Sequence, residues 1–176
     1  TDLVQNAIEA GALEIKLNVE ENHSNLNVVI ADDGKGMDAA TLEKAKDPFY
    51  TDGRKHRHRK VGLGLPFLFQ TAEATGGTAT VESEEGVGTT VAFQLDRKHV
   101  DLPAFGDFAG AAVAMMAYEF EGNLIIERNV DGKGYCASRN ELAEALGNLN
   151  DLDSLALLKQ FMQTNEEEID GTGRSG

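Results

Sequence analysis

The first half of the chain contains regularly alternating hydrophobic and polar residues. Alternation over 13–19 is typical of a strand with one buried face. Its inward positions are predicted to be Leu13, Ile15, Leu17 and Val19. A second alternation over 26–30 follows the polar turn ENHSN, so we expect the two strands to form a hairpin. Two further strands are predicted over 78–83 and 89–95, joined by the turn SEEGVG.

Three other segments of this half show helical patterns. Residues 2–10 place polar side chains on one arc of a helix and apolar ones on the rest. A short helix is predicted over 39–46 with Asp38 as its cap, and another over 65–74 that ends at two glycines. This order predicts an α+β fold, an α/β sandwich over residues 1–96 in which helices cover one face of a mixed β-sheet.

The composition changes after residue 96. An apolar helix is predicted over 106–117, followed by two strands around the turn Asp131–Gly132. Two more helices are predicted, one ending near Leu146 and one over 151–163. We therefore expect a small α+β appendage over 97–165 and a disordered tail over 166–176.

Charge and composition limit the classes of partner. The formal net charge is −14 at pH 7, which argues against nucleic acid as a partner. No apolar run approaches the length of a bilayer span, so no membrane partner is expected. The single cysteine, Cys136, cannot form an internal disulfide and favours a cytoplasmic location. The basic run GRKHRHRK over 53–60 is a local exception and is either a solvated loop or a lid that faces phosphate groups.

The first candidate motif is DLVQNA over 2–7. Asp2 and Asn6 are four residues apart, so both project from one face of the predicted helix. The Asn6 amide oxygen can bind Mg²⁺, which prefers oxygen ligands, and Asp2 can orient or deprotonate a water or an acceptor hydroxyl. The alternative is that both side chains belong to the solvated face of an amphipathic helix.

The second motif is DDGKGM over 32–37. A carboxylate at the end of a strand, Asp32, can accept a hydrogen bond from the exocyclic amine of adenine, which guanine lacks. Gly34 and Gly36 allow a close approach of the backbone to a base and ribose, and Met37 is expected to pack near the base. The alternatives are an ordinary turn at a strand end and, with less support because the glycine spacing does not match a calcium loop, a metal site.

The third and fourth motifs, VGLGLP over 61–66 and GVGTT over 86–90, are glycine-rich turns. Gly62 and Gly64 precede a predicted helix, and backbone N–H groups at a helix start favour phosphate. Thr89 can contact a base or phosphate, although it can equally be a structural strand residue. The chain has no GxxxxGK[ST] sequence and is therefore not a P-loop protein.

Together these strings resemble the ATP-binding domain shared by histidine kinases, DNA gyrase, mismatch-repair MutL and Hsp-type chaperones, the GHKL or Bergerat-fold ATPases. DLVQNAIEAGA resembles the N-box of that family, DDGKGM its adenine-recognition box, and DPFYT the short box before its lid. VGLGLP is similar to the histidine-kinase form of the second glycine box, and GVGTT resembles the closing box. The resemblance covers residues 1–95.

The resemblance implies roles for individual residues. Asn6 would bind Mg²⁺, Asp32 would bind adenine, and Asp2, which stands where the family often has glutamate or asparagine, would be the catalytic base. Residues 53–60 would form the ATP lid. The full set of implied nucleotide contacts is Asn6, Asp32, Gly34, Gly36, Met37, Lys60, Gly62, Leu63, Gly64, Leu65 and Thr89.

We therefore expect a domain that binds ATP or ADP with Mg²⁺ and transfers or hydrolyses the γ-phosphate in a signalling or regulatory role. Whether it is an ATPase or a protein kinase stays open, and the alternative is a non-catalytic ATP-sensing module for protein interaction. No acceptor histidine is recognisable, so any phosphoacceptor is expected elsewhere, such as on a partner protein. The second half of the chain resembles the C-terminal extension of small stand-alone histidine-kinase-like proteins, and a homodimer is among the expected assemblies.

Overall fold

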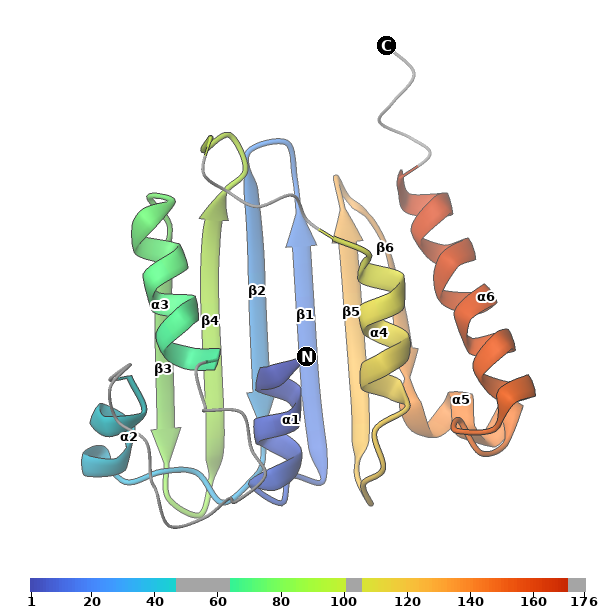
Figure 1. Ribbon diagram of the computed structural model, residues 1–176, viewed down its shortest axis with the longest axis horizontal. Coiled ribbons are helices and arrows are strands. Elements are labelled where there is room, and N and C mark those ends of the chain that lie inside the picture. Colours follow the sequence, from blue (N-terminus) through green and yellow to red (C-terminus); the bar gives the residue numbers. More distant parts are fainter. Residues whose placement is uncertain (47–63, 101–105, 171–176) are drawn as a thin grey trace.

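The computed structural model describes residues 1–46, 64–100 and 106–170. They form one six-stranded sheet in the order β3-β4-β2-β1-β5-β6 (Figure 1). Among the described strands β1 and β5 pair in parallel and every other neighbouring pair is antiparallel, so the sheet is mixed as predicted. The strands are β1 (Glu14–Glu21), β2 (Asn25–Asp32), β3 (Thr78–Glu84), β4 (Gly88–Asp96), β5 (Asn123–Val130) and β6 (Lys133–Ser138).

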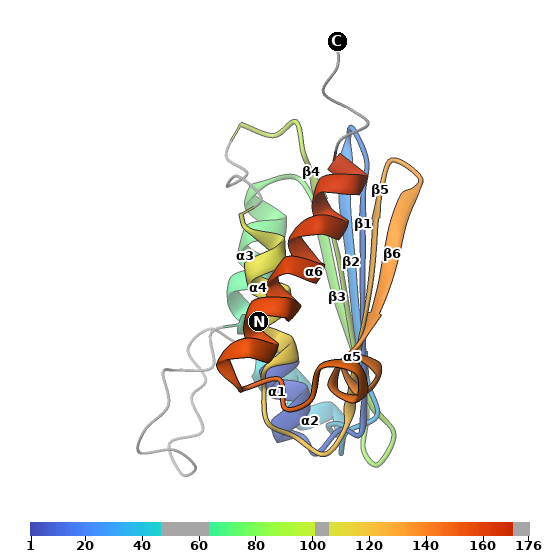
Figure 2. The same cartoon turned by 90° about the vertical axis from the view of Figure 1, so that its right-hand side faces the viewer.

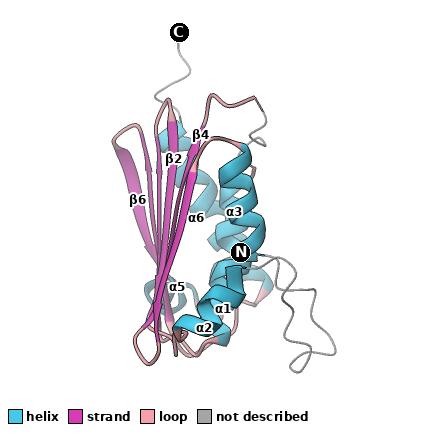
Figure 3. Ribbon diagram, turned by 90° about the vertical axis from the view of Figure 1, so that its left-hand side faces the viewer, coloured by secondary structure: helices cyan, strands magenta, loops and turns pink. Residues whose placement is uncertain are grey.

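Helices cover one face of this sheet, as the side views show for α1, α3, α4 and α6 (Figures 2 and 3). The alternating residues of β1 and β2 point their apolar side chains into the interface between the two layers, where Ile15 and Leu17 are buried. Leu13 was predicted to be the first inward residue, but it precedes the strand and is 62% exposed. The helices are α1 (Asp2–Glu9), α2 (Ala39–Lys46), α3 (Gly64–Ala74), α4 (Phe108–Met116), α5 (Arg139–Leu146) and α6 (Leu152–Asp170).

Local hydrogen bonds explain where several elements begin. The Asp38 carboxylate accepts from the backbone N–H of Thr41 at 2.7 Å, which confirms it as the cap of α2. Asp107 accepts from the N–H of Gly110 at 2.8 Å and caps α4 in the same way. The two-residue turn between β5 and β6 has positive φ at Asp131 and Gly132, as a tight hairpin requires.

The hairpin of β5 and β6 continues the same sheet as the first half of the chain. β5 lies beside β1 with Ile15 opposite Leu124 and Leu17 opposite Ile126, and all four side chains are buried. Sequence alone predicted this hairpin as part of an appendage. The parallel pairing with β1 places its apolar side chains under the same layer of helices.

The last helix is longer than predicted. α6 runs to Asp170, so residues 166–170 are helical and not part of a disordered tail. The physical reason is a buried stripe of Leu158, Met162 and Ile169, whose spacing keeps one face of the helix against the rest of the fold. Residues 171–176 lie outside the described residues.

A buried charge cluster joins the two halves of the chain near the end of β1. The Arg128 side chain, 2% exposed, forms ion pairs with Glu21 and with Glu166 of α6, and its guanidinium lies 5.0 Å from the centre of the Phe108 ring. Arg97 pairs with Glu21 at 2.6 Å, and the Tyr135 hydroxyl donates to Glu166 at 2.7 Å. Burial, followed by the hydrogen bond to Glu166, raises the pKa of Tyr135 and keeps its hydroxyl a donor.

Candidate functional site

Asp32 ends β2 and is held in place by backbone hydrogen bonds. Its carboxylate accepts from the N–H of Gly34 at 2.9 Å, and Thr89 of β4 lies opposite Asp32 in the sheet. Burial raises the pKa of this carboxyl, while backbone N–H groups of Gly34 and Thr89 act in the opposite direction. A half-buried carboxylate at a strand end, fixed in orientation, is suited to accept a hydrogen bond from a ligand.

Thr89, which lies opposite Asp32 in the sheet, belongs with Met37 to a small hydrogen-bond network that sequence reasoning missed. Its centre is Ser83 of β3, whose hydroxyl accepts from the Met37 N–H at 2.8 Å and donates to the Gly88 carbonyl at 3.0 Å. The Ser83 and Thr89 hydroxyls are 2.8 Å apart. Residues 37 and 83 are distant in sequence, so no local pattern could have indicated this contact.

The two glycines of the Asp32 turn have packing roles. A Cβ on Gly34 would lie 2.8 Å from the Cβ of Ala10 and 2.9 Å from a carboxylate oxygen of Asp32. Gly36 has φ of +63°, and a Cβ there would overlap the carbonyl oxygen of Glu84, the last residue of β3. The glycines therefore let the Asp32 turn pass between α1 and the end of β3.

Gly36→Ala is expected to lower the free energy of unfolding by at least about 2 kcal/mol, because it adds steric overlap to a left-handed backbone. Gly86→Ala is the matched control, since Gly86 has φ of +79° and open space around its Cβ position. The Gly86→Ala control should lower the free energy of unfolding by only about 1 kcal/mol, the cost of placing alanine in a left-handed backbone conformation. Urea unfolding of both variants measures the difference, and equal losses would show that the Glu84 contact does not constrain Gly36.

Asp33 has a structural role, in contrast to Asp32. One of its carboxylate oxygens accepts from the N–H groups of Leu13 and Glu14, each at 2.8 Å. These backbone bonds, led by the one from Glu14, lower the pKa of Asp33. The carboxylate thus fixes the start of β1 against the end of β2. Within the described residues no group of three His, Cys, Asp or Glu side chains could hold a metal ion, which disfavours the alternative of an acidic metal site here.

Asp2, Asn6 and Gly64 come together at the start of α3. A Cβ on Gly64 would lie 3.5 Å from the Cβ of Asp2 and 3.9 Å from the amide nitrogen of Asn6. Leu65 follows in the first turn of α3 and is half-buried. The structure therefore brings the first helix and the second glycine motif into contact, although they are distant in sequence. Lys60, Gly62 and Leu63, and the proposed lid over 53–60, lie outside the described residues.

The helix α1 connects this group to the Asp32 turn. The carbonyl of Ala10, just after α1, accepts from the N–H of Lys35 at 2.9 Å. The Asp32 turn therefore packs against the C-terminal end of α1, while Asp2 and Asn6 project from the same helix toward the start of α3. The group at the turn presents a carboxylate and hydroxyls, and the group on α1 presents an exposed carboxylate and a carboxamide. An adenine and a metal-bound phosphate chain need these two kinds of group.

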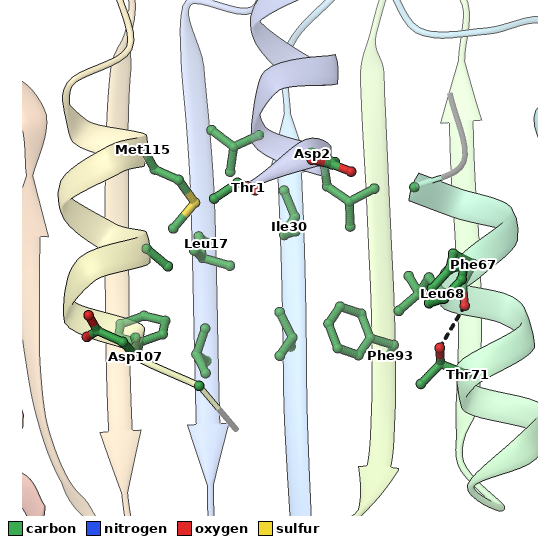
Figure 4. A pocket seen from close by; sticks show the side chains of 18 residues that line it. Thr1, Asp2, Leu17, Ile30, Phe67, Leu68, Thr71, Phe93, Asp107 and Met115 are labelled. Carbon is green, nitrogen blue, oxygen red and sulfur yellow. Dashed lines mark hydrogen bonds between the residues drawn. The ribbon is translucent and has the colours of Figure 1, made fainter. Parts of the chain in front are cut away.

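An apolar cavity of about 690 Å³ adjoins the site (Figure 4). It shares Asp2 and Gly64 with the predicted nucleotide residues, but Asn6, Asp32 and Thr89 do not line it. Its floor is the sheet and its walls are α3, α4 and the first turn of α1. The remaining lining residues are Thr1, Leu3, Val4, Leu17, Val19, Val28, Ile30, Phe67, Leu68, Thr71, Phe93, Gly106, Asp107, Phe108, Ala111 and Met115.

A family model described as "Histidine kinase-, DNA gyrase B-, and HSP90-like ATPase" matches residues 1–99. The match contains every predicted nucleotide residue and ends close to the predicted boundary at 96. No helix in the described parts of the chain is long and apolar enough to cross a bilayer.

Curated relatives include histidine kinases. The chain is 34% identical over 104 residues to the sensor histidine kinase WalK of Bacillus subtilis, a match that covers 55% of this chain and 17% of WalK. It is 38% identical over 71 residues to the histidine protein kinase DivJ of Caulobacter vibrioides, covering 40% of this chain and 12% of DivJ. The chain thus spans less than a quarter of the length of these relatives.

One solved structure with a TM-score above 0.5 supports the fold. The N-terminal domain of a DNA repair protein superposes with a TM-score of 0.56 at 15% identity, over 88% of this chain and 56% of that one. The catalytic domain of the histidine kinase ThkA is 28% identical over 55% of this chain and 60% of that one, with a TM-score of 0.40.

Proposed function

Because the chain belongs to the family of histidine kinase-, DNA gyrase B- and HSP90-like ATPases, we propose that it binds Mg·ATP and transfers or hydrolyses the γ-phosphate in a signalling or regulatory role. The observation that carries this proposal is the half-buried Asp32 carboxylate at the end of β2, fixed by Gly34 and flanked by Thr89. An ATP-dependent role of this kind places the protein in the cytoplasm.

In this proposal Asp32 accepts a hydrogen bond from the exocyclic amine of adenine, and the Thr89 hydroxyl, fixed by Ser83, lies beside it. Guanine carries a carbonyl oxygen at the corresponding position, which would face the carboxylate oxygen and repel it. The site should therefore distinguish ATP from GTP, because an unmatched pair of acceptors in a half-buried site is costly.

Asn6 would hold Mg²⁺ through its amide oxygen, and phosphate oxygens and waters would complete the shell. The bound ion would supply charge neutralisation for the phosphate chain. Asp2, one turn before Asn6 and in contact range of Gly64, would orient or deprotonate the attacking water or hydroxyl. The exposure of both side chains leaves them accessible to a ligand.

Asn6→Ala is expected to remove most of the Mg²⁺-dependent gain in ATP affinity, while binding of metal-free ATP changes little. The physical reason is the loss of the protein's oxygen ligand to the ion. Gln5→Ala is the matched control, since Gln5 lies on the same helix and its side-chain amide donates to Glu9 at 3.2 Å. Titration of each variant with ATP, with and without Mg²⁺, measures the gain. A full Mg²⁺ response in Asn6→Ala would exclude Asn6 as the ligand.

The second candidate is an ATP-sensing module that does not turn ATP over. Incubation with γ-³²P-labelled ATP separates the two candidates. Labelled inorganic phosphate, or label on an added partner protein, supports turnover. Label that remains in ATP during prolonged saturation supports the sensing module.

A further inference from the structure

Asp32, Thr89 and Ser83 form a polar row across three neighbouring strands, β2, β4 and β3 (Figure 1). Thr89 lies opposite Asp32 on one side and opposite Ser83 on the other. Each of the three is two residues from a buried apolar residue of its own strand, so all three side chains point to the face that the helices cover. All three residues are half-buried. The row therefore places two hydroxyls beside the carboxylate that is proposed to bind adenine.

The hydrogen bonds of Ser83 determine which way the Thr89 hydroxyl points its proton. A serine hydroxyl has one proton to donate and two lone pairs that accept. One lone pair of Ser83 accepts from the Met37 N–H at 2.8 Å, and its proton goes to the Gly88 carbonyl at 3.0 Å. The contact of 2.8 Å with Thr89 then uses the second lone pair of Ser83, so the Thr89 hydroxyl is the donor in that contact. The proton of Thr89 is thus committed to Ser83.

This arrangement leaves the Thr89 hydroxyl with lone pairs alone for a ligand. Asp32, as a carboxylate, also offers only acceptors. Two neighbouring acceptors suit a group with two donor hydrogens, and the exocyclic amine of adenine has two. A carbonyl oxygen in place of that amine, as in guanine and hypoxanthine, would face acceptors from both residues. The second unmatched acceptor raises the cost of binding the wrong base.

We propose that Ser83 is a specificity-determining residue, which keeps the Thr89 hydroxyl an acceptor and so favours a base with an exocyclic amine beside Asp32. Ser83 acts through Thr89 and is therefore a positioning residue, and the same oxygen holds the backbone of Met37. The inference rests on the proposed binding of ATP and adds a residue that sets the choice of base. Removal of the Ser83 hydroxyl releases the proton of Thr89, which is then free to donate to a carbonyl oxygen.

The test compares ATP with inosine triphosphate (ITP), whose base has a carbonyl oxygen where adenine has the amine. Displacement of a fluorescent ATP analogue by each nucleotide, in the presence of Mg²⁺ and up to millimolar ITP, gives the ratio of the two affinities. Ser83→Ala should lower the preference for ATP over ITP by about 10-fold, because Thr89 is then free to donate. Ser83→Thr keeps a hydroxyl and should keep the preference of the parent chain. Thr80→Ala is the matched control, since Thr80 lies on the same strand with its side chain exposed.

A second pair of variants tests whether Ser83 acts through Thr89. Thr89→Val should itself reduce the preference for ATP, and the addition of Ser83→Ala should change it no further. Urea unfolding of each variant measures any loss of stability separately from the choice of base.

The inference is overturned if the preference changes equally in Ser83→Ala and Thr80→Ala, or if Ser83→Ala reduces it further in the Thr89→Val background. If the parent chain binds ATP and either result is found, the role of Ser83 alone is wrong and the proposed function stands. If the parent chain does not bind ATP, the proposed function fails and the role of Ser83 fails with it.

Discussion

Asp32→Asn is expected to weaken ATP binding by about 10- to 100-fold, because hydrogen bonds to a charged group contribute about 1.5–3 kcal/mol. Asparagine removes the charge and can present its amide N–H₂ to the exocyclic amine of adenine, so two donors would face each other. The Asp32 side chain also orients the turn through Gly34, and an asparagine oxygen can retain that bond. The loss should therefore appear in ligand affinity and not in folding. Calorimetric titration of the variant with ATP measures it.

Asp33→Asn is the matched control, since it removes the same charge one residue away. An asparagine oxygen at 33 can still accept from the N–H groups of Leu13 and Glu14, so the start of β1 should stay in place. ATP affinity within about twofold of the parent chain is expected for this control. Equal losses in both variants would mean that net charge, and not the position of Asp32, governs binding.

Arg128→Met is expected to lower the free energy of unfolding by about 3–5 kcal/mol, because it removes the buried cation of an ion-pair cluster and leaves its mostly buried carboxylates with fewer partners. Arg128 is 2% exposed and pairs with Glu21 and Glu166, whose side chains are 10% and 14% exposed. The methionine would keep the packing of an aliphatic stem but leave both glutamates without their shared cation. Urea unfolding measures the loss.

Lys16→Met is the control for removing a positive charge from the same sheet. Lys16 is 60% exposed and pairs with Glu14 at 2.9 Å, so its loss should change the free energy of unfolding little. Adding Glu166→Gln to Arg128→Met should recover part of the stability, because the Glu166 carboxylate that has lost its cation is then neutral, whereas Glu21 still pairs with Arg97. If Arg128→Met costs no more than Lys16→Met, the cluster does not join the two halves of the chain.

Much of the fold could be predicted because its signals are local. The alternation of apolar residues over β1 and β2, the cap at Asp38 and the Asp131–Gly132 turn each depend on a few neighbouring residues, and the structure confirms all of them. The mixed sheet with helices on one face was also predicted correctly. The order of the four candidate motifs along the chain was enough to indicate the family whose model matches residues 1–99.

The errors came from contacts between distant residues. Nothing local shows that β5 pairs with β1 in parallel, so the second half was predicted as an appendage. The end of α6 was placed too early because a run of acidic residues resembles a disordered tail, whereas Ile169 is buried against the fold. The Arg128 cluster draws on residues 21, 97, 128 and 166, and no spacing along the chain indicates that they meet.

In the candidate site, too, local patterns could be predicted from the sequence and contacts between distant residues could not. Asp32 could be singled out because a carboxylate after a strand and before glycines is a local pattern. The role of Asp33 in fixing the start of β1, and that of Ser83 in fixing Met37 and Thr89, required the structure. The nucleotide-binding roles of all these residues stay predictions, and Lys60, Gly62 and Leu63 lie outside the described residues.

The central claim is tested most directly by calorimetric titration of the chain with ATP, with and without Mg²⁺, and with GTP in parallel. We expect saturable ATP binding that Mg²⁺ strengthens, and no measurable binding of GTP. Absence of ATP binding, or equal affinity for ATP and GTP, would contradict the assignment of Asp32 and its neighbours as an adenine nucleotide site.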